Sequence, residues 1–247
     1  MNKRKIMMLA LSVMMIAILT IGGTLAYFTA EGGADNVFTM GGVDIELEEE
    51  FEQESELKPG VDVNKDVWVN NTGTSDAYAR VHIAIPSNMD DGNPSFNPVN
   101  NFLHFNFEKE SVQDGLWTWK KEMHKGVGYG DNWNFYTMTI DDVDYNVYVV
   151  THRSAITPGM VTTKALDKVY LDPSVEATVN RDPDTKEIIS YTYKDNHNNE
   201  ITLTPAESKN IKIKVWAEAT QTDPFTDPFT ALNTVFGVPG TYNPWAE

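Results

Sequence analysis

The first notable absence in this chain of 247 residues is cysteine, which does not occur. The protein therefore has no disulfide bond, no thiolate metal ligand and no cysteine nucleophile. A chain of this length can bury a sizeable core without such cross-links, and all-β sandwiches of this size commonly form a single domain. We expect one domain that is held together by packing.

Basic residues are scarce. The chain carries 19 Lys and Arg against 36 Asp and Glu, which gives a net charge of −17 at pH 7. Such a surface repels the phosphates of nucleic acids and the headgroups of anionic lipids. We therefore expect neither nucleic acid nor an anionic membrane surface as a partner.

Catalytic motifs are lacking as well. The chain has five histidines: His82, His104, His124, His152 and His197. No two have the spacing of a His-Glu-x-x-His zinc motif, and His82 and His104 fall in strand-like segments where we interpret them as ordinary residues facing away from the core. Ser154 follows His152, but proximity in sequence supplies neither a nucleophile elbow nor an orienting acid. We predict no catalytic residue and no metal ligand.

Signals for a bound cofactor are weak. The stretch GVGYG at 126–130 lacks the following Lys-Ser/Thr and the strand-then-helix context of a phosphate-binding loop, so it is interpreted as a flexible loop. Two acidic stretches, residues 44–56 and 141–144, offer the oxygen ligands that Ca²⁺ prefers but have no EF-hand spacing. We predict no cofactor and a solvated acidic face, with cation binding by the acidic loops as an alternative that no motif supports.

Six tryptophans raise the alternative of a carbohydrate platform. Trp117 and Trp119 stand two residues apart and would share one face of a strand. We expect core packing for most of the tryptophans, because a sandwich interior needs large apolar groups. Trp245, near the end of the chain, is the exception and is expected to dock on another surface.

The N-terminus has the pattern of an export signal. A basic start at Asn2–Lys5 precedes an apolar run from Ile6 to Ile21, and Thr24–Ala26 places small residues where a signal peptidase cleaves. We predict a signal peptide at 1–26, with cleavage between Ala26 and Tyr27. Its removal takes away three basic residues and no acid, so the net charge changes from −17 to −20.

An uncleaved membrane anchor is the alternative interpretation of the same run. A spanning helix needs roughly 20 apolar residues, and here Gly22-Gly23 and the cleavage-like residues interrupt. We favour cleavage, so contact with the membrane is expected only through the uncleaved signal.

Long helical patterns are also missing, and alternation with period two takes their place. Apolar residues alternate in the segments 43–47, 61–69, 77–85, 103–107, 133–149, 175–179, 188–193 and 211–219. The segments 61–69 and 77–85 flank the turn-forming residues 70–75 and are predicted to form a hairpin. Short strands separated by turn clusters predict an antiparallel sandwich or barrel.

Two regions break the alternation. Residues 90–101 are rich in Pro, Gly and Asn and are predicted to form a surface loop. Residues 221–247 contain the repeat DPFT-DPFT and are predicted to form an extended tail with one helical turn at Ala231–Phe236. The predicted organisation is a signal peptide at 1–26, an N-terminal segment at 27–42, a β-sandwich domain at 43–220 and the tail at 221–247.

Three stretches together resemble one family. They are GGTLAYFTAEGGADNVFTMGGVDIEL at 22–47, LKPGVDVNKDVWVNNTGTSDAYARVHIAI at 57–85 and NIKIKVWAEATQ at 210–221. They are similar to the TasA/camelysin group of exported proteins from Gram-positive bacteria, whose precursors are processed by an ER-type signal peptidase. The resemblance covers the two ends of the domain well and residues 86–200 poorly.

The resemblance implies a jelly-roll β-sandwich that acts as a fibre subunit of the biofilm matrix or as a cell-surface protein. Fibre-forming members join by donor-strand exchange, in which the N-terminal segment of one subunit completes the sheet of the next. Residues 27–40 would serve as that donor strand, because an open sheet edge can accept an extended segment whose side chains fill pockets. The candidate anchors are Tyr27, Phe28, Val37 and Phe38.

Other interpretations stay open. Residues 27–40 can instead pair within their own domain as a first strand. The protein can be a monomeric adhesin or glycan-binding surface protein, which would use Trp117, Trp119 or the long loops. Camelysin-like members are described as metalloproteases, but this chain has no recognisable zinc-ligand motif, so the prediction is a protein that is not an enzyme. Self-association and signal peptidase during export are the expected interactions.

Overall fold

The structure is a computed structural model, and it describes residues 42–51, 57–90, 102–105, 116–118, 135–208 and 211–246. The chain divides into two units between residues 36 and 37, and all the described residues belong to the second. The predicted signal peptide, the cleavage site at Ala26 and Tyr27, and the donor anchors Phe28, Val37 and Phe38 lie outside the described residues. So do Trp119, His124, Trp133, the stretch GVGYG and the predicted loop from residue 91 to residue 101.

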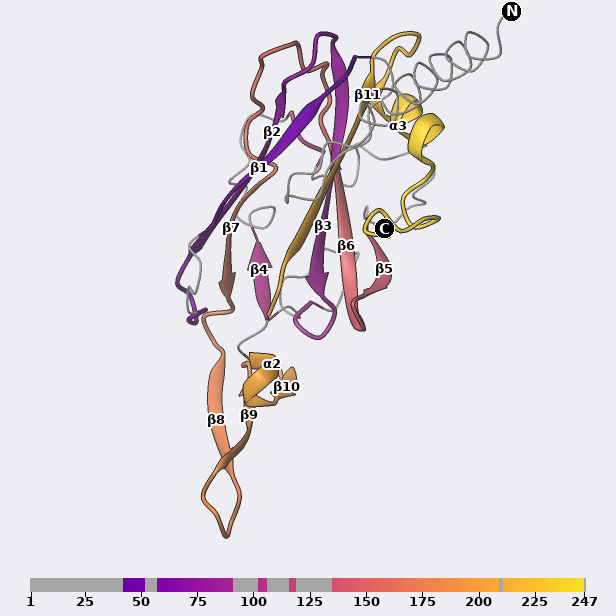
Figure 1. The fold of residues 1–247 in the computed structure, drawn as a ribbon. Helices are drawn as coiled ribbons and strands as arrows, with labels where there is room; N and C mark the ends of the chain where they lie inside the picture. Colours follow the sequence, from indigo (N-terminus) through magenta and orange to yellow (C-terminus); the bar gives the residue numbers. More distant parts are fainter. Residues whose placement is uncertain are drawn as a thin grey trace, which may run out of the picture. The chain divides into compact units, whose positions relative to one another are not determined.

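Two four-stranded sheets form the body of the second unit (Figure 1). The first sheet has the order β1 (Ile45–Phe51), β2 (Val63–Asn71), β7 (Leu166–Leu171) and β4 (Leu103–Phe105). The second has the order β11 (Lys214–Gln221), β3 (Ala77–Pro86), β6 (Val143–Thr151) and β5 (Phe135–Ile140). The ladders within both sheets are antiparallel.

The pairing of these strands is nested. β2 pairs with β7 in the first sheet, and β3 pairs with β6 in the second. A long hairpin that is rolled up so that its successive pairs fall in alternate sheets has the topology of a jelly roll. The prediction of an all-β, antiparallel, jelly-roll-like sandwich is therefore confirmed.

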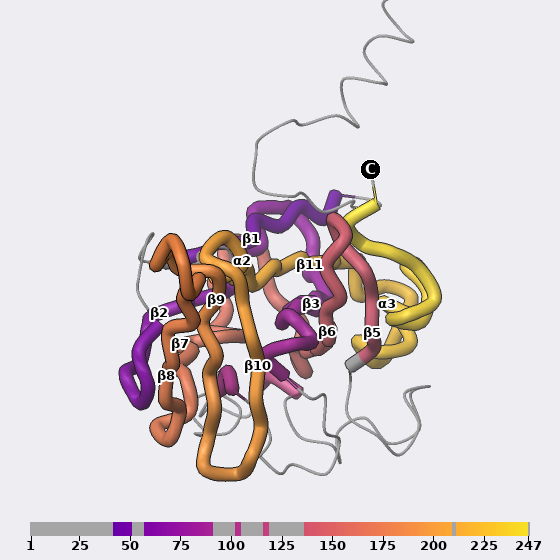
Figure 2. The backbone as a smooth tube through the Cα atoms, turned by 90° about the horizontal axis from the view of Figure 1, so that it is seen from below, coloured from indigo at the N-terminus to yellow at the C-terminus, as the bar shows by residue number. Residues whose placement is uncertain are grey.

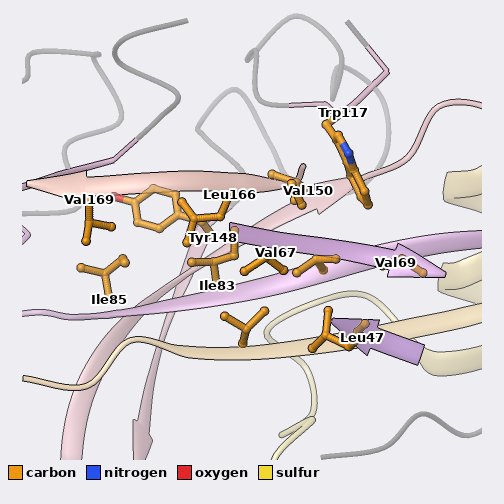
Figure 3. Close-up of a cluster of buried hydrophobic side chains, with 14 of the residues drawn as sticks. Leu47, Val67, Val69, Ile83, Ile85, Trp117, Tyr148, Val150, Leu166 and Val169 are labelled. Carbon is orange, nitrogen blue, oxygen red and sulfur yellow. The ribbon is translucent and has the colours of Figure 1, made fainter. Parts of the chain in front are cut away.

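The main core lies between the two sheets. Side chains from β2 and β7, among them Val67 and Leu166, lie beside Ile83 and Ile85 of β3 (Figure 3). Alternate residues of each strand point inward because side chains alternate between the faces of a strand. A side chain as fully buried as Ile83 contributes roughly 1.5–3 kcal/mol to folding.

The hairpin of β5 and β6 follows the predicted pattern. Ile140 pairs with Val143, so Asp141 and Asp142 form the two-residue turn between the strands. Both aspartates have positive φ, 51° and 63°, which is the conformation of the turns that match the twist of a hairpin, and Asp tolerates it better than most residues. Local turn chemistry thus sets this pairing.

The predicted hairpin of residues 61–69 and 77–85 is wrong. β2 belongs to the first sheet and β3 to the second, so the connection between them crosses from one sheet to the other. The side chain of Asn71 holds this crossing, with Nδ2 donating to Ser75 O at 2.9 Å and to Ile156 O at 2.7 Å. Turn-forming residues reverse the chain, but they do not decide which strand becomes the neighbour.

A second, smaller sheet projects from the sandwich (Figure 1). We call it the arm; it consists of β8 (Glu176–Arg181), β9 (Ile188–Lys194) and β10 (Glu200–Leu203) in the order β10-β9-β8, and the short helix α2 (Pro205–Ser208) follows it. One face of the arm carries Thr178, Thr192 and Thr202 in one row, while Val179 and Tyr191 pair on the other face. The arm is therefore polar on one face and apolar on the other.

The C-terminal residues depart from the predicted extended tail. They contain the nine-residue helix α3 (Pro228–Phe236), which starts at the second copy of the DPFT repeat. The side chain of Asp227 caps this helix by accepting a hydrogen bond from Thr230 N at 2.9 Å, and a proline occupies the first turn. Ala231 and Leu232 are fully buried. Seen from below, the segment covers the outer side of the sheet that contains β5 and β6 (Figure 2). No helix among the described residues is long and apolar enough to span a bilayer.

Candidate functional site

The densest polar cluster in the described residues lies on the outer face of the second sheet. Odd-numbered residues of β3 point into the main core, so Arg80 and His82 point to the opposite face. Arg80 pairs with Glu218 of β11 across the ladder, which puts both side chains on this face. Helix α3 and the residues after it cover them, which turns an outer sheet face into an interior.

Arg80 is the centre of the cluster and is 1 % exposed. Its Nε donates to Glu218 Oε2 at 2.5 Å, and Nη1 donates to Asn233 Oδ1 at 2.8 Å. Nη2 donates to the carbonyl of Gly237 at 3.0 Å and to the hydroxyl of Tyr242 at 2.6 Å. A guanidinium can be buried at modest cost only when its donors find acceptors, and three of these four acceptors come from the C-terminal segment.

Glu218 supplies the negative charge of the cluster. The hydroxyl of Tyr242 donates to both of its carboxylate oxygens, at 2.6 and 2.8 Å. Burial raises the pKa of Glu218, but His82, the charge of Arg80 and the Tyr242 hydroxyl outweigh burial and lower this pKa to about 2. Glu218 is therefore ionised at neutral pH, with the permanent charge of Arg80 beside it.

His82 is fully buried next to this ion pair. Its Nδ1 lies 3.1 Å from the hydroxyl of Tyr136, and its Nε2 lies 3.2 Å from Glu218 Oε2 but outside hydrogen-bonding alignment. The rings of Tyr136, Tyr242 and Trp245 meet the imidazole edge-on. Burial lowers the pKa of His82, so the imidazole is neutral at pH 7.

The other described histidines lie in separate places. His104 of β4 stacks on Tyr170, and its Nε2 lies 2.9 Å from Asp172 Oδ2. His152 Nδ1 lies 2.7 Å from the backbone carbonyl of Ser154, so the structure gives no nucleophile–base contact through that serine hydroxyl. The interpretation of His82 and His104 as strand residues holds, but both are buried rather than solvated.

A zinc site does not fit the residues that the structure describes. No group of three His, Asp or Glu side chains gathers there with the geometry of a metal site. The acidic neighbour that the structure gives His82 is the carboxylate of Glu218, which already binds the guanidinium of Arg80. A cation beside a ligand disfavours a second cation. We therefore propose no metal-dependent reaction at this cluster.

The remaining candidates from the sequence are placed as follows. The described part of the first acidic stretch is β1, where Glu46, Glu49 and Glu50 are exposed. In the second stretch, Asp141 pairs with Lys214, while Asp144 accepts a hydrogen bond from Thr139 at 2.7 Å. These acids thus have protein partners or face solvent.

Trp117 does not present its ring as a platform. It is 2 % exposed, and its Nε1 donates to Thr163 O at 2.8 Å. Trp245 docks as expected, against a second apolar cluster on the outer face of the second sheet. That cluster contains Ala84, Ile140, Tyr145 and Val147.

Sequence reasoning missed the ionic cluster. The available signal was the opposite face of two strands: Arg80 and His82 stand among small apolar residues in AYARVHIAI, and Glu218 does so in VWAEATQ. A strand whose second face carries a few charged residues resembles an ordinary solvated strand. Only the covering segment, which is distant in sequence, makes that face an interior.

Comparison with protein families gives one match. Residues 1–124 match the family described as Camelysin metallo-endopeptidase, a range that includes β1 to β4 with Arg80 and His82 but neither Glu218 nor the C-terminal segment. A search of curated proteins finds no match. The match spans half of the chain and includes the strands that begin the sandwich, and it agrees with the family resemblance of the N-terminal motifs. The chain therefore belongs to the camelysin family.

Proposed function

We propose that the chain is an exported structural protein whose copies join into fibres, with the mature N-terminal segment of one copy adding a strand to the next. Membership of the camelysin family supports export and a place at the cell surface or in the extracellular matrix. The observation that carries the proposal is the edge strand β8 of the arm in the described structure, on which Val179 is 45 % exposed.

From Gly42 onward the chain is fixed to its own domain. Thr74 N donates to Gly42 O at 3.0 Å, and Gly73 N donates to Asp44 O at 2.9 Å. Val43 is buried in the core, and β1 pairs with β2 along its whole length. Among the described residues the first sheet therefore begins with β1, the strand that follows the proposed donor segment in the sequence.

The geometry of the first sheet suits assembly from head to tail. Ile45 pairs with Asn71 at one end of the sheet, whereas Val63 pairs with Val169 at the other, where β7 leads into the arm (Figure 1). The attachment point of the N-terminal segment and the arm are thus at opposite ends of the sandwich. A contact between unlike ends that does not close into a ring generates a filament.

The arm offers a suitable sheet edge. β8 is an edge strand, and Val179 and Ile189 on the arm are 45 % and 55 % exposed. In the part of the chain that the structure describes, β1 is also an edge strand, but it carries the exposed Glu46 and Glu50, and like charges on an edge oppose strand addition. A segment with apolar anchors such as Val37 and Phe38 is therefore better suited to β8 than to β1.

The test compares the mature chain from Tyr27 with a chain that lacks residues 27–40. We expect fibres by electron microscopy from the first and none from the second, because the donor strand is gone. Circular dichroism should show a β-rich domain with little change in thermal unfolding, because a donor strand completes the sheet of the next copy rather than that of its own domain. A peptide of residues 27–40 added in trans should bind and stabilise the shortened chain.

Two results would contradict the proposal. Fibres that persist without residues 27–40 would show that another surface drives assembly. Loss of fibres together with a large loss of stability that the peptide does not restore would show that the segment is an internal strand of its own domain.

The family description favours a second candidate, a metallo-endopeptidase. Casein cleavage with added zinc, with and without a chelator, distinguishes the two. We expect no zinc-dependent cleavage, because the described residues hold no ligand cluster. Cleavage that is lost when one histidine is replaced, with the fold intact, would establish the enzyme instead. A protein that forms no fibres and cleaves no casein, but is retained on cell-wall polysaccharide, would instead be an adhesin.

A further inference from the structure

The C-terminal residues 227–246, which we call the strap, form a structural unit of their own. The main-chain hydrogen bonds that the described structure gives the strap outside α3 close within it, as from Thr241 N to Val238 O at 3.1 Å. Before the strap, Thr222 N still donates to Asp76 O of the sandwich. The strap is thus capped and turned by its own backbone and adds no strand to the sheet.

Side chains hold the strap on the outer face of the second sheet. Arg80 donates to Asn233, Gly237 and Tyr242, and its guanidinium carbon lies 5.8 Å from the ring centroid of Phe236. Trp245 packs on the apolar cluster beside His82. Arginine and aromatic anchors in a desolvated setting are what dominates the energetics of contacts between separate proteins.

One short linker joins the strap to the sandwich. β11 ends at Gln221, and five residues, 222–226, lead to the helix cap at Asp227. A strap that leaves its own sheet and occupies the sheet of an identical chain therefore remakes every contact described above, and such exchange is a low-cost route to association.

We propose that the outer face of the β11-β3-β6-β5 sheet is a binding groove for the strap, and that the strap of one copy occupies the groove of a second copy. The occupant is identified by the fit that the structure displays: the groove holds this segment with a buried Arg80–Glu218 pair and with the ring of Trp245. An empty groove would expose these groups and the apolar cluster around Tyr145, which favours refilling it.

Two physical terms govern how often the exchange occurs. The tether raises the effective concentration of a chain's own strap, so the internal arrangement dominates in dilute solution. The exchanged arrangement has the same contacts and gains weight as protein concentration rises. A linker of five residues spans at most about 17 Å, so the two exchanged copies would face each other through their second sheets.

The absence of native cysteine allows a direct test. A Cβ on Gly240, whose φ is +88°, would lie 3.0 Å from the Cβ of Tyr136 in β5. Formation of a disulfide within one chain of a Tyr136→Cys/Gly240→Cys double variant therefore checks that the strap still docks with a cysteine at this strained position. One mature chain carries Tyr136→Cys alone, and a second carries Gly240→Cys alone. The two are mixed at high concentration under a mild oxidant, in one sample directly and in another after they have been unfolded and refolded together. A covalent dimer of the two kinds of chain reports exchange.

The matched control replaces Tyr136→Cys with Thr185→Cys, at an exposed position in the arm. We expect about tenfold more mixed dimer from the Tyr136→Cys chain than from this control, because docking raises the local concentration of the two thiols. Adding Trp245→Ala to the Gly240→Cys chain should reduce the dimer, since an anchor is lost. A mixed dimer no more abundant than the control, while the double variant closes normally, would overturn the proposal.

A second measurement covers the case in which the double variant does not close. Chains with Thr185→Cys carry a donor dye and chains with Thr234→Cys carry an acceptor dye, both at exposed positions outside the contact. Energy transfer is followed after joint refolding at increasing concentration. We expect transfer that increases with concentration and is lost with Trp245→Ala. Transfer that is unaffected by this substitution, or absent at all concentrations, would contradict exchange of the strap.

Discussion

At the residue scale, the Arg80–Glu218 pair is where a single substitution should cost most. Both side chains are nearly inaccessible, with 1 % and 4 % of the side chain exposed. We expect Arg80→Ala to lower the free energy of unfolding by about 3–5 kcal/mol, because it leaves a buried carboxylate without its partner. Urea unfolding followed by circular dichroism measures the change.

An exposed ion pair in the same chain provides the control for Arg80→Ala. Lys194 Nζ lies 3.8 Å from Glu200 Oε2, and both side chains are 55 % exposed. Lys194→Ala should change the free energy of unfolding by less than about 1 kcal/mol, because solvent screens exposed pairs. Equal effects of the two substitutions would contradict the special role of the buried pair.

The same cluster should make the protein sensitive to acid. The pKa of His82 is lowered by burial, and that of Glu218 is lowered to about 2. The unfolded chain therefore binds more protons than the folded chain below the ordinary pKa values of both groups, and stability falls with pH. We expect the loss to begin near pH 6.5 through His82 and to continue below pH 4.5 through Glu218.

A pair of histidine variants isolates the first part of this pH dependence. His82→Gln should flatten the dependence of the urea midpoint between pH 7 and pH 5, since the buried imidazole is gone. His197→Gln, at an exposed position, should leave the slope as it is in the unmodified chain. An unchanged slope in His82→Gln would show that other groups control this pH range.

At the element scale, the crossing between β2 and β3 depends on close approach of two backbones. A Cβ added to Gly73 would lie 2.5 Å from Asp44 N and 2.7 Å from Gly42 O. We expect Gly73→Ala to lower the free energy of unfolding by about 1–3 kcal/mol, because backbone atoms that are hydrogen-bonded must move apart. The start of β1 should loosen, which hydrogen exchange at Asp44 and Ile45 would detect.

Gly159 gives the contrast for Gly73→Ala. A Cβ on Gly159 meets nothing within 4 Å, but its φ is +76°, so Gly159→Ala tests conformational strain without a clash and should cost about 1 kcal/mol. It should leave hydrogen exchange at the start of β1 unchanged. The same loss of protection in both variants would mean that the crossing does not depend on the close contact.

The elements that the sequence predicted well are those whose signal is local. The alternation in 143–149 and the Asp141-Asp142 turn together determine a hairpin with its register. The pairing of β2 with β7 joins residues about a hundred positions apart, and β7 itself has a weak alternation, so neither was predicted. Period two identifies strands and their faces, but neighbours in a jelly roll are set by contacts that no local pattern records.

The candidate site shows the same limit more strongly. His82 was correctly assigned to the strand face that points away from the core, because alternation is a local property. Its burial depends on α3, whose length the pattern underestimated, and on Tyr242 and Trp245 beyond it. The helix cap at Asp227 was not recognised in the sequence, because the Asp-Pro pair that begins each DPFT repeat also occurs at the start of turns.

At the scale of the whole molecule, net charge opposes contact between copies. The chain carries a net charge of −17, which the proposed removal of residues 1–26 would change to −20, and in the described structure the edge strand β1 presents the exposed Glu46 and Glu50. Such an edge resists unspecific pairing, while the less acidic β8 remains open. Specific association through apolar anchors must therefore overcome a long-range repulsion between like-charged sandwiches.

This balance predicts how the proposed assembly responds to salt. The screening length falls from about 10 Å at 0.1 M salt to about 3 Å at 1 M, so repulsion between approaching copies weakens, whereas burial of apolar anchors such as Phe38 is hardly affected by that screening. We expect the lag before fibre growth to shorten as sodium chloride is raised, measured by light scattering and checked by electron microscopy. Replacing Glu46 and Glu50 by glutamine should shorten the lag at low salt and reduce the response to salt, because part of the repelling charge is removed. The matched control replaces Asp76 and Asp142, at exposed positions outside β1 and the arm, by asparagine; it removes the same charge and should shorten the lag less. A lag that lengthens with salt would mean that ion pairs between copies, rather than apolar anchors, hold the contact together.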